Sequence, residues 1–284
     1  MPLLATIAWL LARCGATDSL LGMLAMMALV VSWSGLVWSI WKSTHARDAV
    51  EGALLDGLGF DYRAQIPAER SSKLRSEVSF ADWRNPGAMP VPGVEVLRNI
   101  PYGPHGVRQQ LDIYRPEIIP EGGCPVLFQI HGGAWMIGDK KHQALPLMYH
   151  LASRGWICVT ANYRLSPSVA FPTHLLDCKK ALCWVRENGK EYGMDTDFIA
   201  VTGGSAGGHL TALMGLTANR PELQPDTPDT DTSLQAAVPF YGIYDFLVRY
   251  NQHPNREVYQ KFLRGKVMHE TPEENPELWE LASP

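Results

Sequence analysis

Several patterns are missing from this sequence of 284 residues, and each absence argues against a class of protein. There is no block of basic residues, and 25 Lys and Arg against 29 Asp and Glu leave a formal net charge of −4, so charge does not indicate nucleic-acid binding. The five cysteines form no C-x-x-C pair, which argues against a disulfide framework or a zinc site. What is present, 46% apolar and 19% charged residues, is typical of a globular chain with a buried core.

Residues 19–41 contain no ionisable side chain. As a helix rising about 1.5 Å per residue, this segment would reach roughly 35 Å, enough to cross a hydrocarbon layer of about 30 Å. Trp33, Trp38 and Trp41 gather near its C-terminal end, where indole rings favour the membrane interface, and Lys42 follows. The alternatives are a signal peptide, which lacks its basic start here, and a buried core helix. We expect residues 1–43 to form a single-pass anchor in contact with membrane lipid.

The charges that flank this segment predict its orientation. Lys42 and Arg47 follow it and only Arg13 precedes it, a bias that places the bulk of the chain in the cytoplasm. The absence of any N-x-S/T acceptor agrees with a domain that never meets glycosylation. Residues 44–92 are interrupted by Gly and Pro and are interpreted as a connector or cap piece without chemistry of its own.

From residue 93 onward, short apolar runs alternate with segments of helical periodicity. Strands are predicted at 94–98, 110–114, 125–130, 156–161, 198–202 and 236–241, and helices at 142–153, 173–191 and 206–218. Such alternation is typical of right-handed crossovers and a mostly parallel sheet with helices on both faces. The predicted fold class is α/β.

One loop of this sheet carries a G-x-S-x-G pattern around Ser205, between a predicted strand and a predicted helix. A sharp turn there lifts a serine hydroxyl clear of the sheet, and the flanking glycines let strand and helix approach closely. The helix that begins at Ala206 directs free N–H groups and the positive end of its dipole at the reacting oxygen. A nucleotide site is disfavoured, because neither G-x-G-x-x-G nor a Walker lysine is present.

A second loop, HGGAW at 131–135, directly follows the buried strand that ends at Ile130. Its successive glycines, Gly132 and Gly133, let the backbone turn N–H groups into a concavity. Together with the N–H of Ala206 they could hold the oxyanion of a tetrahedral intermediate. The two loops together predict acyl transfer to a serine.

With NYRLSP at 162–167 and YGIYD at 241–245, these motifs resemble the hormone-sensitive-lipase-like branch of the α/β-hydrolase fold. That branch includes arylacetamide-deacetylase-like and bacterial acetyl-esterase-type carboxylesterases. The resemblance implies a carboxylesterase or lipase acting on small uncharged esters without a cofactor, with Ser205 as nucleophile and Gly132, Gly133 and Ala206 as oxyanion donors. Gly204 departs from members with Asp before the serine, and we expect little effect on the reaction class.

The sequence departs from this family more seriously after Phe246. The family order is Ser, then Asp or Glu, then His, with the last two on loops that follow two further strands. Here the remaining residues are charged and interrupted by Pro, without another apolar strand. We therefore expect residues 93–284 to be a C-terminally incomplete hydrolase domain, inactive as given because the acid and the base of the triad are absent.

The visible residues offer weak substitutes for the missing groups. His209 follows Ser205 by one helical turn but is interpreted as a polar residue on the helix flank. His253 and His269 lie in a polar segment, solvated or part of a cap. Asp177 and Asp245 are expected to hold local hydrogen bonds, and none of these three histidines and two aspartates is predicted to be catalytic.

The acidic residues between 222 and 231 lie in a Pro-rich loop without a histidine, so no metal site is predicted. Within enzymes, an amide or formamide hydrolase, or a methylesterase acting on a lipidated substrate, would use the same two loops. Outside enzymes, the alternative is a non-catalytic, membrane-tethered relative, which applies if residue 284 is the natural end.

Overall fold

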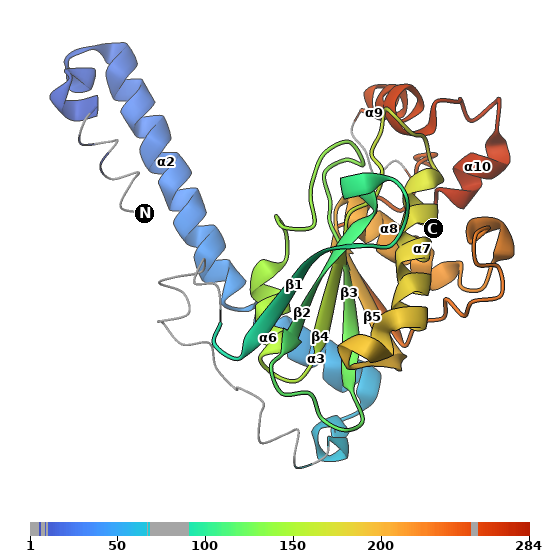
Figure 1. Cartoon of the computed structure of the whole chain (residues 1–284). Coiled ribbons are helices and arrows are strands. Elements are labelled where there is room, and N and C mark those ends of the chain that lie inside the picture. Colours follow the sequence, from blue (N-terminus) through green and yellow to red (C-terminus); the bar gives the residue numbers. More distant parts are fainter. Residues whose placement is uncertain (1–5, 7–8, 10, 67, 69–90, 251–254) are drawn as a thin grey trace. The chain divides into compact units, whose positions relative to one another are not determined.

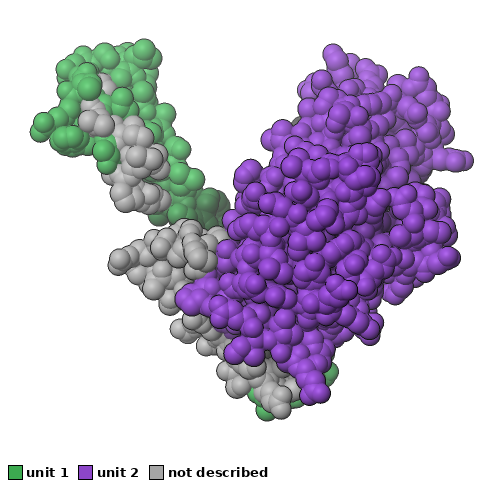
Figure 2. Space-filling view, in the orientation of Figure 1, with its two compact units in different colours: residues 1–77 green, residues 78–284 purple. Residues whose placement is uncertain are grey.

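The computed structural model describes residues 6, 9, 11–66, 68, 91–250 and 255–284, in two compact units that comprise residues 1–77 and 78–284 (Figures 1 and 2). In the first unit, α2 (Leu20–Ser43) is followed by α3 (Ala46–Leu58). Ser19 caps α2, because its hydroxyl accepts the N–H of Gly22 at 3.1 Å.

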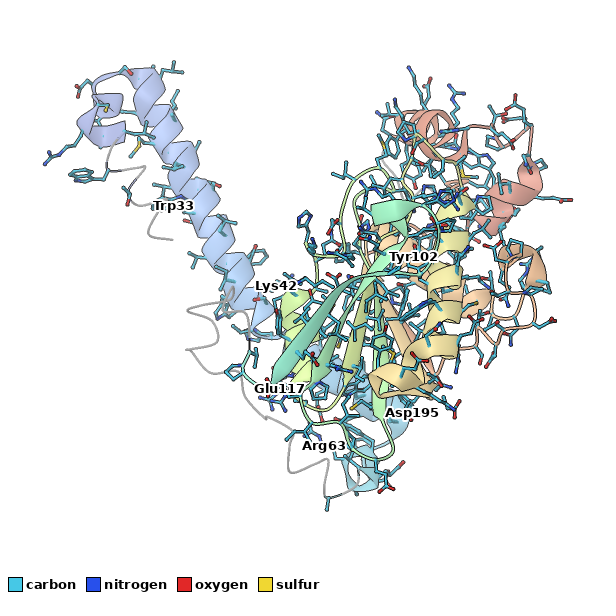
Figure 3. The ribbon with its side chains drawn as sticks, in the orientation of Figure 1. Trp33, Lys42, Arg63, Tyr102, Glu117 and Asp195 are labelled. Carbon is cyan, nitrogen blue, oxygen red and sulfur yellow. The ribbon has the colours of Figure 1, made fainter. Side chains whose placement is uncertain are left out.

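None of the residues of α2 is buried within the protein. Trp33 lies along the helix and Lys42 in its last turn (Figure 3), where the Lys42 ammonium lies 5.2 Å from the ring centre of Trp38. Among the described residues, one candidate membrane span is found, within Leu20–Leu58, with a mean hydropathy of 2.1 over its apolar window. The length and composition needed to cross a bilayer are therefore present in the folded chain.

The second unit is built on a six-stranded sheet with the order β1-β2-β4-β3-β5-β6. Its strands are β1 (Val94–Pro101), β2 (Gln110–Pro116), β3 (Cys124–Ile130), β4 (Ile157–Ala161), β5 (Met194–Gly204) and β6 (Ala236–Phe240). β1 and β2 are antiparallel to their neighbours, whereas β4, β3, β5 and β6 run parallel. The mostly parallel sheet predicted from the sequence is confirmed.

Side chains of the parallel strands point alternately to the two faces of the sheet. Val126 and Phe128 of β3 pack in the larger core, with Leu182 of α7 (Thr173–Asn188) and Leu210 of α8 (Ala206–Leu216). This face holds most of the buried apolar side chains.

The opposite face is covered by a shorter helix, α6 (Leu145–Ala152). Leu127 of β3 packs there with Met148 and Ala152 of α6. The sequence pattern predicts a start at residue 142. The helix begins later because Ala144 adopts a left-handed conformation with φ of 57°.

The chain that follows β6 forms helices: α9 (Arg256–Phe262), a π-helical turn (Leu263–Met268) and α10 (Pro276–Leu281). Despite their charged sequence, these elements bury Leu263, Val267 and Trp279 against the larger core. Within the described residues after β6, no further strand forms, and β6 is the edge of the sheet, with Phe240 half exposed.

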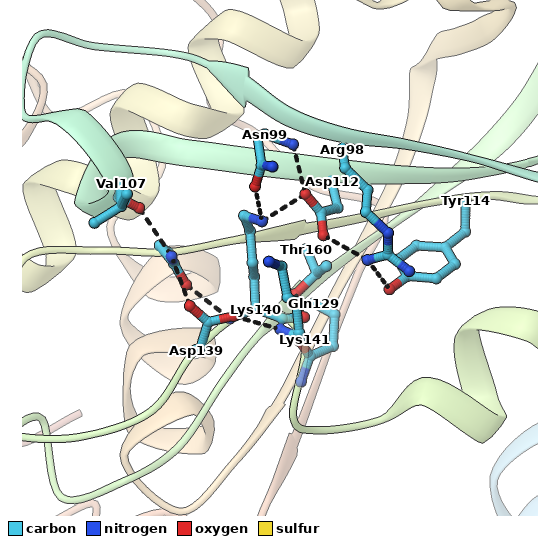
Figure 4. Close-up of polar contacts among 11 residues, drawn as sticks. Arg98, Asn99, Val107, Asp112, Tyr114, Gln129, Asp139, Lys140, Lys141 and Thr160 are labelled. Carbon is cyan, nitrogen blue, oxygen red and sulfur yellow. Dashed lines mark hydrogen bonds and ion pairs between the residues drawn. The ribbon is translucent and has the colours of Figure 1, made fainter. Parts of the chain in front are cut away.

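A buried polar network ties the loop after β3 to the sheet (Figure 4). The Lys140 ammonium donates to Asp112 Oδ1 at 2.6 Å and to Asn99 Oδ1 at 2.8 Å, and the side chains of Lys140 and Asp112 are almost fully buried. Arg98 donates to the other carboxylate oxygen of Asp112 at 3.0 Å. The backbone N–H of Lys140 donates to Asn162 Oδ1 at 2.7 Å, so both the main chain and the side chain of Lys140 are held.

We predict that Asp112→Leu destabilises the fold by about 3–5 kcal/mol, because it leaves the Lys140 ammonium buried without its counter-charge. The measurement is a urea titration of the full chain in mild detergent, followed by tryptophan fluorescence. Adding Lys140→Met should recover most of the loss. The exposed pair of Arg115 with Glu95 supplies the control, and Glu95→Gln should cost less than about 1 kcal/mol. Equal losses from both single variants would contradict a special role of the buried pair.

Candidate active site

Ser205 occupies the sharp turn between β5 and α8, with φ of 57° and ψ of −121°. A non-glycine residue rarely adopts this conformation, and the surrounding contacts hold it. The N–H of Ser205 donates to Phe240 O at 3.0 Å. On either side, Cβ atoms at Gly203 and Gly207 would lie 2.6 and 2.2 Å from Ile130 O, so only glycine lets the turn pack against β3.

The HGGAW loop after β3 lies directly beside this turn. A Cβ at Gly132 would lie 3.2 Å from Ser205 Cβ and 2.5 Å from Gly204 O. Gly133 has φ of 122°, a left-handed value that favours glycine. Ala206, the first residue of α8, is fully buried at the start of that helix. The structure therefore places Gly132, the first of the two loop glycines, beside the serine with which the sequence predicts it to act.

The N–H of Gly132 already has an acceptor, which sequence reasoning missed. Gln143 Oε1, from the loop before α6, accepts this N–H at 2.7 Å. On the other side of the same glycine, its carbonyl accepts a hydrogen bond from His131 Nδ1 at 2.8 Å. Sequence spacing alone gives no signal for Gln143, because its contact depends on the path of the loop between β3 and α6.

His209 is fully buried and both of its ring nitrogens are engaged away from Ser205. Trp135 Nε1 donates to His209 Nδ1 at 3.2 Å, and His209 Nε2 donates to Ala282 O at 2.9 Å. Phe246 stacks on the ring, with centroids 4.6 Å apart. Burial lowers the pKa of His209 to about 4, so the ring is neutral near pH 7. The expectation of a polar residue on the helix flank is wrong, because segments distant in sequence enclose this ring.

The other candidate residues make local contacts. Asp177 accepts hydrogen bonds from the Arg164 guanidinium, the shortest at 2.6 Å, and from Gln109 at 2.7 Å. Its carboxylate raises the pKa of Arg164 above the usual value. Asp245 pairs with Arg249 at 3.0 Å.

His269 is exposed, and His253 lies outside the described residues. Across the part of the chain that the structure describes, no histidine nitrogen is hydrogen-bonded to the Ser205 hydroxyl. Among the same residues, the acidic loop at 222–231 included, no three His, Cys, Asp or Glu side chains are grouped so that they could hold a metal ion.

Gly204, which precedes the nucleophile, lies against the side chain of Tyr241. A Cβ there would lie 2.5 Å from the hydroxyl of Tyr241, so the tyrosine ring fills the space that a side chain would need. Tyr241 is the first residue after β6 and is 79% exposed. Because this ring is exposed, it can move aside, so the contact does not by itself require glycine at position 204.

The BD-FAE family model matches residues 111–284, which include all but the first residue of β2, the strands β3 to β6 and both loops. The chain belongs to the BD-FAE family of α/β-hydrolases. The resemblance to α/β-hydrolase carboxylesterases that the motifs indicate is confirmed.

Two curated relatives come from Mycobacterium tuberculosis. Esterase LipQ is 42% identical over 252 residues, covering 86% of this chain and 58% of that protein. The probable carboxylic ester hydrolase LipM is 46% identical over 238 residues, covering 78% of this chain and 52% of that protein. The chain thus spans about half the length of the curated relatives it matches.

Among solved structures, a bifunctional GH43-CE protein of Bacteroides eggerthii is 26% identical, with a TM-score of 0.58. The match covers 66% of this chain and 28% of that one. It agrees with the α/β-hydrolase arrangement of the sheet and its helices.

We predict that the fold loses stability as the pH falls from 6.5 towards 4. Burial lowers the pKa of His131 and His209 to about 4 and that of His174 to about 3, whereas an unfolded chain titrates near 6.5. In this window the unfolded state binds protons that the folded state excludes. Each histidine can therefore remove about 2 kcal/mol between pH 6.5 and 5.

The measurement is the urea midpoint of unfolding at pH 7.5, 6.5, 5.5 and 5.0. These histidines contribute no slope above pH 7.5, where they are neutral in both states. His174→Gln should flatten the decline, whereas His105→Gln, at an exposed position, should leave it unchanged. A midpoint that stays constant or rises from pH 6.5 to 5 would contradict the assignment.

Proposed function

We propose that this chain carries the nucleophile and oxyanion loop of a serine carboxylesterase that hydrolyses small uncharged carboxylic esters. The observation that carries the proposal is the placement of Ser205, on a strained strand-to-helix turn, directly beside Gly132. The printed names of the relatives, an esterase and a probable carboxylic ester hydrolase, support ester chemistry.

In the proposed reaction, Ser205 Oγ attacks the ester carbonyl and its proton passes to a general base. The carbonyl oxygen becomes an oxyanion, which N–H groups of Ala206 and of the glycine loop stabilise. The start of α8 contributes the positive end of its dipole to the same oxygen. The alcohol then leaves with a proton from the base, and water hydrolyses the acyl-serine.

We further propose that the base and its carboxylate partner come from residues outside these 284. Two observations support this. Both ring nitrogens of His209 are occupied, and Asp177 is committed to Arg164 and Gln109. By this proposal residues 93–284 lack the last strands of the domain, and the 284-residue chain by itself is inactive because none of its described residues accepts the Ser205 proton.

We propose that α2 anchors the protein in the membrane as a single span and that the catalytic domain lies in the cytoplasm. α2 supports it through its length, its apolar composition and the cluster of Trp38, Trp41 and Lys42 at its end. Residues 44–92 would then connect the bilayer to the domain.

We predict that Ser205→Ala in the full-length gene product reduces hydrolysis of p-nitrophenyl acetate and butyrate by about 10⁴-fold or more. Fluorophosphonate labelling of the protein should disappear with it. Ser233→Ala, on a surface loop, is the matched control and should retain full activity. A Ser205→Ala enzyme that keeps a tenth of the activity would show that the nucleophile is another residue. If the unaltered gene product shows neither hydrolysis nor labelling, the result favours a non-catalytic relative.

We predict that the full chain stays with membranes after high-salt and alkaline carbonate washes, because α2 presents an apolar surface along its whole length. A shortened chain that begins at Thr44 should appear in the soluble fraction. Replacing Val30 and Val37 by Lys tests the same point with the length unchanged and should also release the protein. Recovery of the full chain in the high-salt wash would show that α2 does not anchor the protein in the membrane.

A further inference from the structure

Gln143 lies in a loop whose two ends are fixed. At one end, Lys140 is buried in its ion pair with Asp112. At the other end, Ala144 turns the chain into α6 with a left-handed φ of 57°. Gln143 is held between these points, partly buried, and is directed at the HGGAW loop.

The contact between Gln143 and Gly132 has a fixed polarity. Gly132 offers an N–H donor, so the atom that faces it at 2.7 Å must be the side-chain oxygen of Gln143. The contact is also close to the nucleophile, because a Cβ at Gly132 would lie 3.4 Å from Gln143 Oε1 and 3.2 Å from Ser205 Cβ. Gln143 thus reaches the immediate surroundings of the serine without touching its hydroxyl.

His131 holds the same glycine from its other end. Its Nδ1 donates to the Gly132 carbonyl at 2.8 Å. In a planar trans peptide, that carbonyl and the N–H of Gly133 point in opposite directions. Because Gln143 fixes the N–H of Gly132 and His131 fixes its carbonyl, both peptide planes that meet at Gly132 are set, and the direction of the Gly133 N–H follows.

We propose that Gln143 is a positioning residue for the oxyanion hole: it occupies the N–H of Gly132, so that Gly133 and Ala206 supply the donors to the oxyanion. The inference rests on the proposed esterase function. Its advantage is that the donor is oriented before substrate arrives, so no reorganisation is required when charge develops on the carbonyl oxygen.

The experiment compares Gln143→Leu with the unaltered full-length gene product. Leucine has a similar size but no acceptor, so the glycine loop loses one of its two supports. We expect kcat for p-nitrophenyl butyrate to fall by about 10- to 100-fold while KM changes less than about 2-fold. Lys141→Leu, at an exposed site in the same loop, is the matched control and should leave both values unchanged.

A second readout separates positioning from a loss of folded protein. An aryl trifluoromethyl ketone adds to the serine, and its carbonyl oxygen becomes an oxyanion in the same hole. Its inhibition constant should rise in Gln143→Leu by about the same factor as kcat falls. An inhibition constant does not depend on how much of the protein is folded, so a general loss of structure would leave it unchanged.

A third readout does not need activity and is made on the 284-residue chain in detergent. Exchange of the Gly132 amide hydrogen, followed by mass spectrometry of the peptide around it, should become faster in Gln143→Leu. In Gln143→Glu, which keeps an acceptor, exchange should stay slow.

Unchanged exchange in Gln143→Leu would show that the contact does not hold the loop and would overturn the inference. Faster exchange with unchanged kcat and inhibition constant would overturn the catalytic part, while the esterase function would stand. Absence of Ser205-dependent hydrolysis in the unaltered gene product would instead overturn the proposed function itself, and the oxyanion role of the loop with it.

Discussion

The close approach of two backbone segments, the turn around Ser205 and the end of β3, is the constraint on which the site depends. The backbone segments approach so closely at Ile130 O that Cβ atoms at Gly203 or Gly207 would lie within 2.6 Å of this oxygen. Since β3 and β5 are neighbouring parallel strands, their C-terminal ends reach the same edge of the sheet. The loop that follows β3 and the turn that follows β5 can therefore only meet there, and this meeting places Gly132 beside the serine.

Around this contact, several buried polar groups are committed to holding loops. Asp112 and Lys140 fix the loop after β3, and Asp177 fixes Arg164 in the loop after β4. His209 is enclosed between aromatic rings with both nitrogens bonded. A ring in such surroundings is neutral and immobile, which suits a structural support and not a proton acceptor, because an acceptor must gain a charge during each turnover.

Much of this arrangement follows from local sequence patterns. The short apolar runs predict the strands, and two glycine-rich loops placed behind strands predict where the chemistry lies. Three features depend on contacts between distant segments and could not be predicted in this way. The acceptor for Gly132 is Gln143, the space beside Gly204 is filled by Tyr241, and the partner of His209 is Ala282. The helices after β6 could not be recognised from the charged composition of that segment, because each contributes only a few apolar side chains, such as Trp279, to the core.

The hydrogen bonds of His209 link three segments of the chain that are distant in sequence. Trp135 belongs to the glycine-rich loop, His209 to the nucleophile helix, and Ala282 to the end of α10. If the segment around Ala282 moves away, the buried His209 N–H loses its acceptor, at a cost of about 1–3 kcal/mol. Displacement of α10 would therefore destabilise α8, the helix that follows Ser205. Residues distant from the nucleophile in sequence thus support its position.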